Sequence, residues 1–129
     1  PDDIDTNFLL NFKKLILSQV EKGKKFVIIT GGGYTARQYI NSSKDLSNSS
    51  NDDLDWIGIA STRLNAELLR VVFGEFALEK IIMDPDNLIK TDKPIMLGAG
   101  WKPGNSSDLA AIHIAKSLGS KKLIIHKIY

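Results

Sequence analysis

The chain contains no cysteine in its 129 residues, which excludes a disulfide framework and a metal site built from thiolates. A chain without cysteine fits the reducing cytoplasm, and we expect that location. Long apolar runs are also lacking: none approaches the roughly 20 residues that span a bilayer, and no signal peptide is recognisable. We therefore expect no membrane partner.

There is also little excess of charge, since 17 lysines and arginines face 15 aspartates and glutamates. These residues are spread along the chain without a basic stripe, so nucleic acid is not an expected partner. We expect the partner to be a small molecule. Of the histidines, His113 and His126 have no other metal-type ligand at a useful spacing, and no metal site is predicted. Neither a Ser-His-Asp nor a Cys-His arrangement is visible, so nucleophilic hydrolysis is not expected.

Apolar spacing predicts alternating helices and strands. With 43% hydrophobic and 25% charged residues, the composition is that of one globular domain, which we expect to span residues 1–129. Helices are expected from Asp5 or Thr6 to about Gly23, over 34–40, over 54–73, and from Ser106 or Ser107 to Gly119; strands over 26–30, 79–83, 94–98 and 122–126; and a polar surface loop over 41–53. This order predicts a three-layer αβα sandwich with a largely parallel sheet.

The strand expected over residues 26–30 ends in Gly31, Gly32 and Gly33, and the rest of the chain is organised around this turn. Four consecutive β-branched or aromatic residues predict a strand buried on both faces. Glycines let a charged group approach bare backbone N–H groups, and a following helix aims its positive end at the same point, so the turn predicts phosphate or nucleotide binding. The alternative is that the glycine turn serves only to reverse the chain.

A second glycine-bearing loop, residues 98–107, also follows a predicted strand, so the two loops can face one crevice. It offers backbone N–H groups, the cation of Lys102 and a helix N-terminus. Alternatively, Ser106 and Ser107 only cap the next helix and Asp108 complements its dipole. Trp101 could be the wall of a base pocket or a hydrophobic plug beneath the loop.

Two charged residues lie near these loops. Arg37 is one helical turn beyond Gly33, within reach of a phosphate, although a helical arginine is commonly a solvated surface residue. Asp55 could accept hydrogen bonds from a ligand, or it could be an acidic residue at a helix N-terminus.

Three segments carry a resemblance to a known family. They are Gly31-Gly32-Gly33-Tyr34-Thr35-Ala36-Arg37; Asp55-Trp56-Ile57-Gly58-Ile59 followed by Thr62-Arg63-Leu64-Asn65-Ala66; and Pro103-Gly104-Asn105-Ser106-Ser107-Asp108-Leu109-Ala110-Ala111. In order and spacing, over nearly the whole chain, they resemble the amino acid kinase superfamily and, within it, the uridylate (UMP) kinases of archaea and some bacteria.

The resemblance implies transfer of the ATP γ-phosphoryl group to UMP, with Mg²⁺ accompanying ATP. It places Gly32 and Asp55 at UMP, Gly33 and Arg37 on the ATP side, and Asp108 as the catalytic residue that organises basic groups around the transferred phosphoryl. The residues implied to wrap the UMP phosphate and sugar are Trp101, Lys102, Pro103, Gly104, Asn105, Ser106 and Ser107. Catalysis would be positioning and charge neutralisation without a covalent intermediate.

The family's first strand, ending in Gly-Gly-Ser, and its carboxyl-terminal ATP lobe have no counterpart in the printed sequence. We therefore expect these residues to form the acceptor-side part of an incomplete amino acid kinase fold, and to show no phosphoryl transfer by themselves. The resemblance also implies a homo-oligomer, a hexamer, with the helix over 54–73 as a candidate contact. Two alternatives stay open: a kinase for another small acid or phosphate, and a non-catalytic nucleotide-binding module on the same fold.

Overall fold

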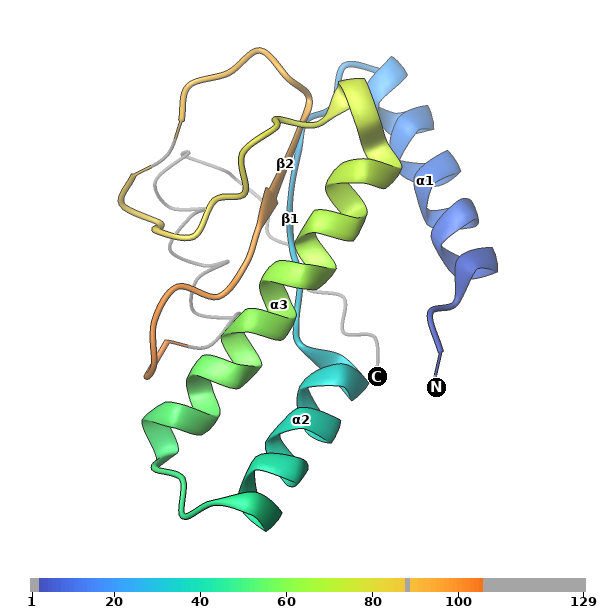
Figure 1. Ribbon diagram of the computed structural model, residues 1–129. Helices are drawn as coiled ribbons and strands as arrows, with labels where there is room; N and C mark the ends of the chain where they lie inside the picture. Colours follow the sequence, from blue (N-terminus) through green and yellow to red (C-terminus); the bar gives the residue numbers. More distant parts are fainter. Residues whose placement is uncertain (1–2, 88, 106–129) are drawn as a thin grey trace.

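The computed structural model describes residues 3–87 and 89–105, which form an α/β arrangement with a parallel pair of strands, as predicted (Figure 1). The elements are α1 (Thr6–Glu21), β1 (Phe26–Ile29), α2 (Gly33–Leu46), α3 (Asn51–Phe73), the short 3-10 helix η1 (Gly74–Phe76) and β2 (Ile95–Gly98). The helix expected after Ser106 or Ser107 and the strand expected over 122–126 lie outside the described residues.

The helix α1 begins and ends where the sequence predicts. The Asp5 carboxylate accepts a hydrogen bond from the backbone N–H of Phe8, with 2.9 Å between the two atoms, so Asp5 is the N-cap. After the helix, Gly23 takes a φ of 86°, a left-handed conformation that glycine adopts without strain. The apolar side of α1 packs on the core, where Phe12 meets the ring of Phe73 edge to face.

The two strands pair in parallel with Phe26 opposite Ile95 and Ile29 opposite Gly98. The residues of β1 are only half-buried, so the prediction that this strand is buried on both faces is wrong for the described residues. Among the described residues β2 has neighbours along both edges, because the segment preceding it in the chain bridges the edge that β1 does not occupy. Ile95 and Leu97 of β2 are accordingly fully buried.

The strand predicted over residues 79–83 is not formed as such. Single bridges join Ala77 to Ile95 and Ile82 to Gly98, and bends at Glu79 and Lys80 separate them. The segment thus runs alongside β2 and Ile82 is buried, but the bends interrupt the ladder of hydrogen bonds that a strand requires.

The predicted loop over 41–53 is mostly helical. The helix α2 continues to Leu46, and the connection to α3 is only residues 47–50. Serine hydroxyls hydrogen-bond to one another here: the Ser49 hydroxyl lies 2.8 Å from that of Ser43 in α2 and 2.7 Å from that of Ser47. The start of α3 is a capping box in which Ser50 and Asp53 exchange hydrogen bonds, so this helix begins earlier than the apolar pattern indicates.

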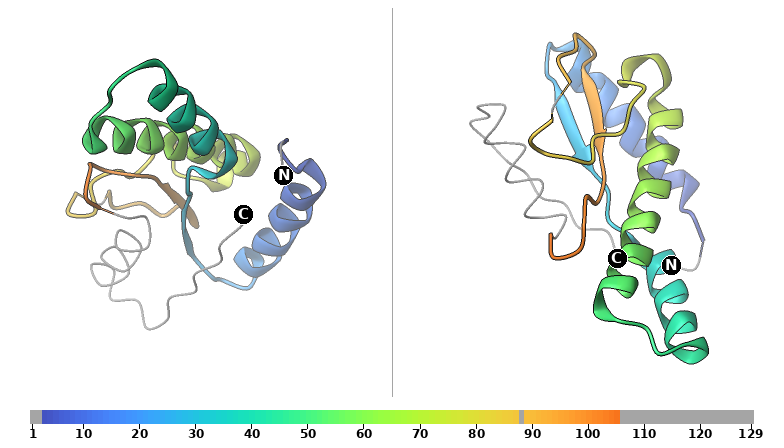
Figure 2. Two further views of the ribbon diagram at one scale, coloured as in Figure 1. Left: turned by 90° about the horizontal axis from the view of Figure 1, so that it is seen from below. Right: turned by 60° about the vertical axis from the view of Figure 1, so that its left-hand side comes forward.

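The helix α3 lies over one face of the parallel strands, with α2 beside its amino-terminal half and α1 beside its carboxyl-terminal half (Figures 1 and 2). The core lies between α1, α3, the two strands and the segment before β2, and it is formed by Ile16, Ala66, Leu69, Phe73, Ala77, Ile81, Ile95, Leu97 and Ala99. No helix in the described part of the chain combines the length and apolar character that crossing a membrane requires.

Candidate active site

A cleft of about 590 Å³ opens at the carboxyl ends of β1 and β2, where the sequence predicted a crevice. Both glycine-bearing loops line it, together with one side of α2 and the first half of α3. The lining residues are Gly31, Gly32, Gly33, Ala36, Arg37, Ile40, Leu54, Asp55, Gly58, Ile59, Thr62, Gly100, Lys102, Pro103, Gly104 and Asn105. Parallel pairing brings the two loops together, since both β1 and β2 end at this edge.

The first loop is held close to α3 because it has no side chains. A Cβ atom at Gly32 would lie 2.6 Å from the Ala36 Cβ and 3.3 Å from the Gly58 carbonyl oxygen. Gly33 needs glycine for another reason, since its φ is 60°. The loop therefore presents bare backbone at the start of α2, which is the arrangement that suits an anion.

The second loop also packs closely on α3. A Cβ at Gly100 would come within 3.0 Å of both the Ile59 Cγ1 and the Thr62 Oγ1. Further along, the Asn105 N–H donates to the Lys102 carbonyl oxygen across 3.3 Å and closes a turn in which Gly104 has a φ of 88°. The cation of Lys102 is exposed beside this turn.

Arg37 of α2 and Asp55 of α3 are both exposed and both line the cleft. With Lys102 they give it two cations and one carboxylate. Cations and bare N–H groups can bind phosphate, and a carboxylate can accept hydrogen bonds from the N–H or O–H groups of the same ligand. This combination matches a phosphate-bearing molecule that also carries polar groups.

Trp101 does not line the cleft. It lines a separate hollow of about 440 Å³, together with Trp56 and Arg63. The Lys102 ammonium lies 4.1 Å from the centre of the Trp101 ring, so the tryptophan positions this cation by a cation–π contact.

Three polar residues of α3 hold the two loops, although sequence reasoning gave them no role. The Thr62 hydroxyl accepts from the Gly100 N–H (2.8 Å), and the Thr62 carbonyl oxygen accepts from the Thr30 hydroxyl (2.7 Å). The Asn65 amide donates to the Gly31 carbonyl oxygen (2.8 Å), and the Arg63 guanidinium donates to carbonyl oxygens of the second loop. The signal in the sequence was their place in the segment Thr62-Arg63-Leu64-Asn65-Ala66, which carried the family resemblance without a role for these side chains.

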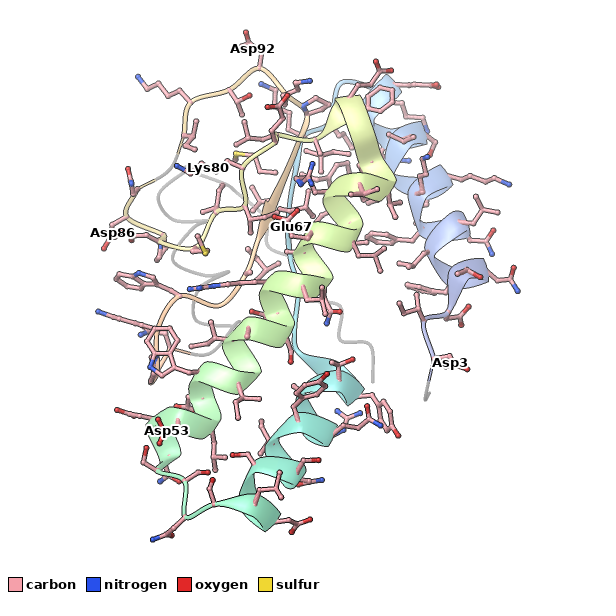
Figure 3. All side chains as sticks on the ribbon, in the orientation of Figure 1. Asp3, Asp53, Glu67, Lys80, Asp86 and Asp92 are labelled. Atoms are coloured by element: carbon pink, nitrogen blue, oxygen red, sulfur yellow. The ribbon has the colours of Figure 1, made fainter. Side chains whose placement is uncertain are left out.

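Ser106, Ser107 and Asp108 lie outside the described residues. Within residues 3–87 and 89–105, no group of three or more histidines and acidic residues is placed to hold a metal ion. Figure 3 shows acidic side chains on separate parts of the molecule, among them Asp3, Asp53, Glu67, Asp86 and Asp92. The described residues therefore offer no cluster of carboxylates that could bind Mg²⁺ by itself.

The chain is similar to uridylate kinases in sequence and in fold. The chain is 36% identical to the uridylate kinase of Staphylothermus marinus over 97% of this chain and 59% of that protein, and 31% identical to that of Methanocaldococcus jannaschii over 88% and 49%. The crystal structure of uridylate kinase from Archaeoglobus fulgidus superposes with a TM-score of 0.74 at 28% identity, covering 90% of this chain and 53% of that one. The chain thus spans about half the length of these relatives.

The family model described as the amino acid kinase family matches residues 3–127, nearly the whole chain. The match includes both glycine-bearing loops and the helix α3 that holds them. The chain belongs to the amino acid kinase family.

Proposed function

We propose that the chain forms the acceptor side of a uridylate kinase, which transfers the γ-phosphoryl group of ATP to UMP and gives UDP for pyrimidine nucleotide biosynthesis. The observation that carries the proposal is the single cleft in which both glycine-bearing loops meet Asp55 and Arg37. Its volume of about 590 Å³ suits a small ligand. The relatives are uridylate kinases, which favours UMP as that ligand.

In this proposal Gly32, Asp55 and the loop from Trp101 to Ser107 bind UMP. The exposed Asp55 carboxylate accepts hydrogen bonds from the uridine part, while the loop wraps the phosphate and sugar. Trp101 contributes from outside the cleft, because it lines the separate hollow. Gly33 and Arg37 lie on the ATP side, with the guanidinium on a phosphate.

The chemistry proposed is in-line transfer between two bound nucleotides. Such transfer needs positioning and neutralisation of phosphate charge, and the protein forms no covalent bond to the phosphoryl group. Mg²⁺, bound to the ATP phosphates, would supply further charge neutralisation. Asp108, the proposed catalytic residue, organises the basic groups around the transferred phosphoryl. In a chain extended to the relatives' length, Asp108→Asn should lower kcat far more than it changes KM.

A thermal-shift series with UMP, UTP, acetylglutamate, aspartate and isopentenyl phosphate tests the acceptor. Stabilisation by the uridine nucleotides alone supports the proposal. Stabilisation by one of the other acceptors instead identifies a kinase for that acid or phosphate, and the uridylate assignment is then wrong. If uridine nucleotides bind and the extended chain releases no ADP in a coupled assay, the chain is a nucleotide-binding module without catalysis.

The proposal extends to a cytoplasmic homo-oligomer, a hexamer by resemblance, with α3 as a contact. Trp56, Leu64 and Val71 of this helix are 48%, 63% and 65% exposed, which is apolar surface that a second copy would cover. Sedimentation velocity measures the oligomer directly. A monomer at all concentrations would remove this part of the proposal.

A further inference from the structure

Arg63 of α3 contacts the backbone of the second loop at two consecutive residues. Its Nε donates to the carbonyl oxygen of Gly100 (3.3 Å) and its Nη2 to that of Trp101 (3.1 Å). Arg63 lines the hollow that contains Trp101 and is not among the residues that line the cleft. A guanidinium has a planar fork of donors, so one side chain can hold two consecutive carbonyl groups at once.

The orientation of these two carbonyls also sets the orientation of two N–H groups. The described part of the chain has no cis peptide bond, and in a planar trans peptide the C=O and the following N–H point in opposite directions. The N–H groups of Trp101 and Lys102 are therefore turned away from Arg63. Neither of them donates to an acceptor within residues 3–87 and 89–105.

The neighbouring amides of the loop are already used. The Gly100 N–H donates to the Thr62 hydroxyl, and the Asn105 N–H donates to the Lys102 carbonyl oxygen. Among the described residues, the loop thus leaves two consecutive donors without a partner, one at Lys102, which lines the cleft, and one at Trp101 directly before it. Consecutive backbone N–H groups next to a cation are suited to bind a phosphate.

We propose that Arg63 is a positioning residue: by holding the carbonyls of Gly100 and Trp101, it turns the N–H groups of Trp101 and Lys102 toward the phosphate of the acceptor in the cleft. This inference rests on the proposed function only where it identifies the phosphate as that of UMP. Arg63 itself does not touch the ligand. Its charge, held outside the cleft, adds to the attraction for an anion inside it.

Amide NMR spectra of the labelled chain test the direction of the two donors. Titration with UMP and with inorganic phosphate should shift the amide signals of Trp101 and Lys102, whereas uridine, which has no phosphate, should leave them in place. If UMP binds and neither signal moves, the inference is wrong while the proposed function stands. If inorganic phosphate moves both and UMP does not bind, the inference stands and the proposed function is wrong.

Substitution of Arg63 tests the positioning role. In Arg63→Met the UMP affinity should fall about tenfold, since two charge-assisted constraints on the loop are lost, and the uridine affinity should change less than about twofold. Arg63→Lys keeps the charge without the fork and should give a smaller loss. Arg70→Met is the matched control, because Arg70 lies on the same helix and pairs with Glu67 at 2.7 Å, away from the loops.

A merely structural Arg63 would give a different result. The variant would then lose UMP and uridine affinity in equal proportion, or lose thermal stability while the ratio of the two affinities is kept. Either outcome overturns the proposal. If Arg63→Met does not fold, the ratio measured with Arg63→Lys and the amide shifts of the parent chain decide the question.

Discussion

The side-chain amide of Asn65 donates a hydrogen bond to the carbonyl oxygen of Gly31, with 2.8 Å between Nδ2 and the oxygen. The same nitrogen lies 3.4 Å from the Gly32 carbonyl oxygen, so one helical residue holds the turn that follows β1. One turn earlier in α3, Thr62 accepts from the Gly100 N–H of the other loop. The distance between the two loops is therefore set by a single turn of one helix.

Asn65→Ala should lower the free energy of unfolding by about 1–2 kcal/mol, because two loop carbonyls lose their donor. Asn65→Asp should lower it at least as much, since an ionised carboxylate has no donor and would face the two carbonyl oxygens. Urea denaturation measures both changes.

The control for this pair is Asn11→Ala on α1, where the asparagine is exposed and makes no side-chain hydrogen bond within residues 3–87 and 89–105. Its effect should stay within about 0.5 kcal/mol. Equal stability of Asn65→Ala and Asn11→Ala would mean that the amide does not hold the loop in solution.

Local patterns predicted much of this fold. The apolar runs gave β1 and β2 to within a residue, and Asp5 and Gly23 marked the ends of α1, because strands, caps and glycine turns depend on neighbouring residues. The glycines after β1 and β2 predicted one cleft, because parallel strands end at the same edge.

The errors have a common physical origin in contacts between distant segments. The polar stretch that was expected as a loop continues as α2 because this helix packs on α3. The segment over 79–83 lies beside β2 and bends there, and no local propensity indicates these bends. The roles of Thr62, Arg63 and Asn65 are hydrogen bonds to residues more than 30 positions away, and periodicity carries no information about these.

The glycines of the first loop should differ sharply in what they tolerate. Gly32→Ala should lower the free energy of unfolding by about 1–3 kcal/mol, because the new Cβ would lie 2.6 Å from the Ala36 Cβ of α2 and 3.3 Å from the Gly58 carbonyl oxygen of α3, so the loop would have to shift against both helices. Gly33→Ala meets no atom within 4 Å, but at a φ of 60° it should cost about 1–2 kcal/mol in backbone strain. Thermal or urea denaturation ranks the variants.

Gly31→Ala is the control for the glycine series, since its Cβ would have no atom within 4 Å and its φ is not in the left-handed region. It should be neutral or slightly stabilising, because alanine reduces the freedom of the unfolded chain. A Gly32→Ala protein as stable as Gly31→Ala would contradict the close packing of this loop against α2 and α3.

Asp55→Asn should weaken UMP binding about tenfold and ATP binding much less, because an acceptor-only carboxylate is replaced by an amide that presents a donor to the same ligand groups. Calorimetry with each nucleotide measures the two affinities. Asp52→Asn is the matched control, since Asp52 is an exposed acid in the first turn of the same helix and does not line the cleft. Unchanged UMP affinity in Asp55→Asn would remove this carboxylate from the site.

Arg37→Ala should weaken ATP binding by about 1.5–3 kcal/mol, since the contact of a guanidinium with phosphate is a charge-assisted hydrogen bond. The free energy of unfolding should change by less than about 0.5 kcal/mol, because Arg37 is exposed. The loss should shrink in high salt, which screens the attraction between exposed charges.

Lys44→Ala separates this local contact from the general effect of removing a cation from α2. Lys44 lies in the last turn of the same helix and does not line the cleft, so its removal should leave ATP affinity nearly unchanged. If Arg37→Ala and Lys44→Ala lower ATP affinity equally, the guanidinium acts only through net charge. If Arg37→Ala instead lowers the melting temperature and keeps the affinity, Arg37 stabilises the helix and does not contact the nucleotide.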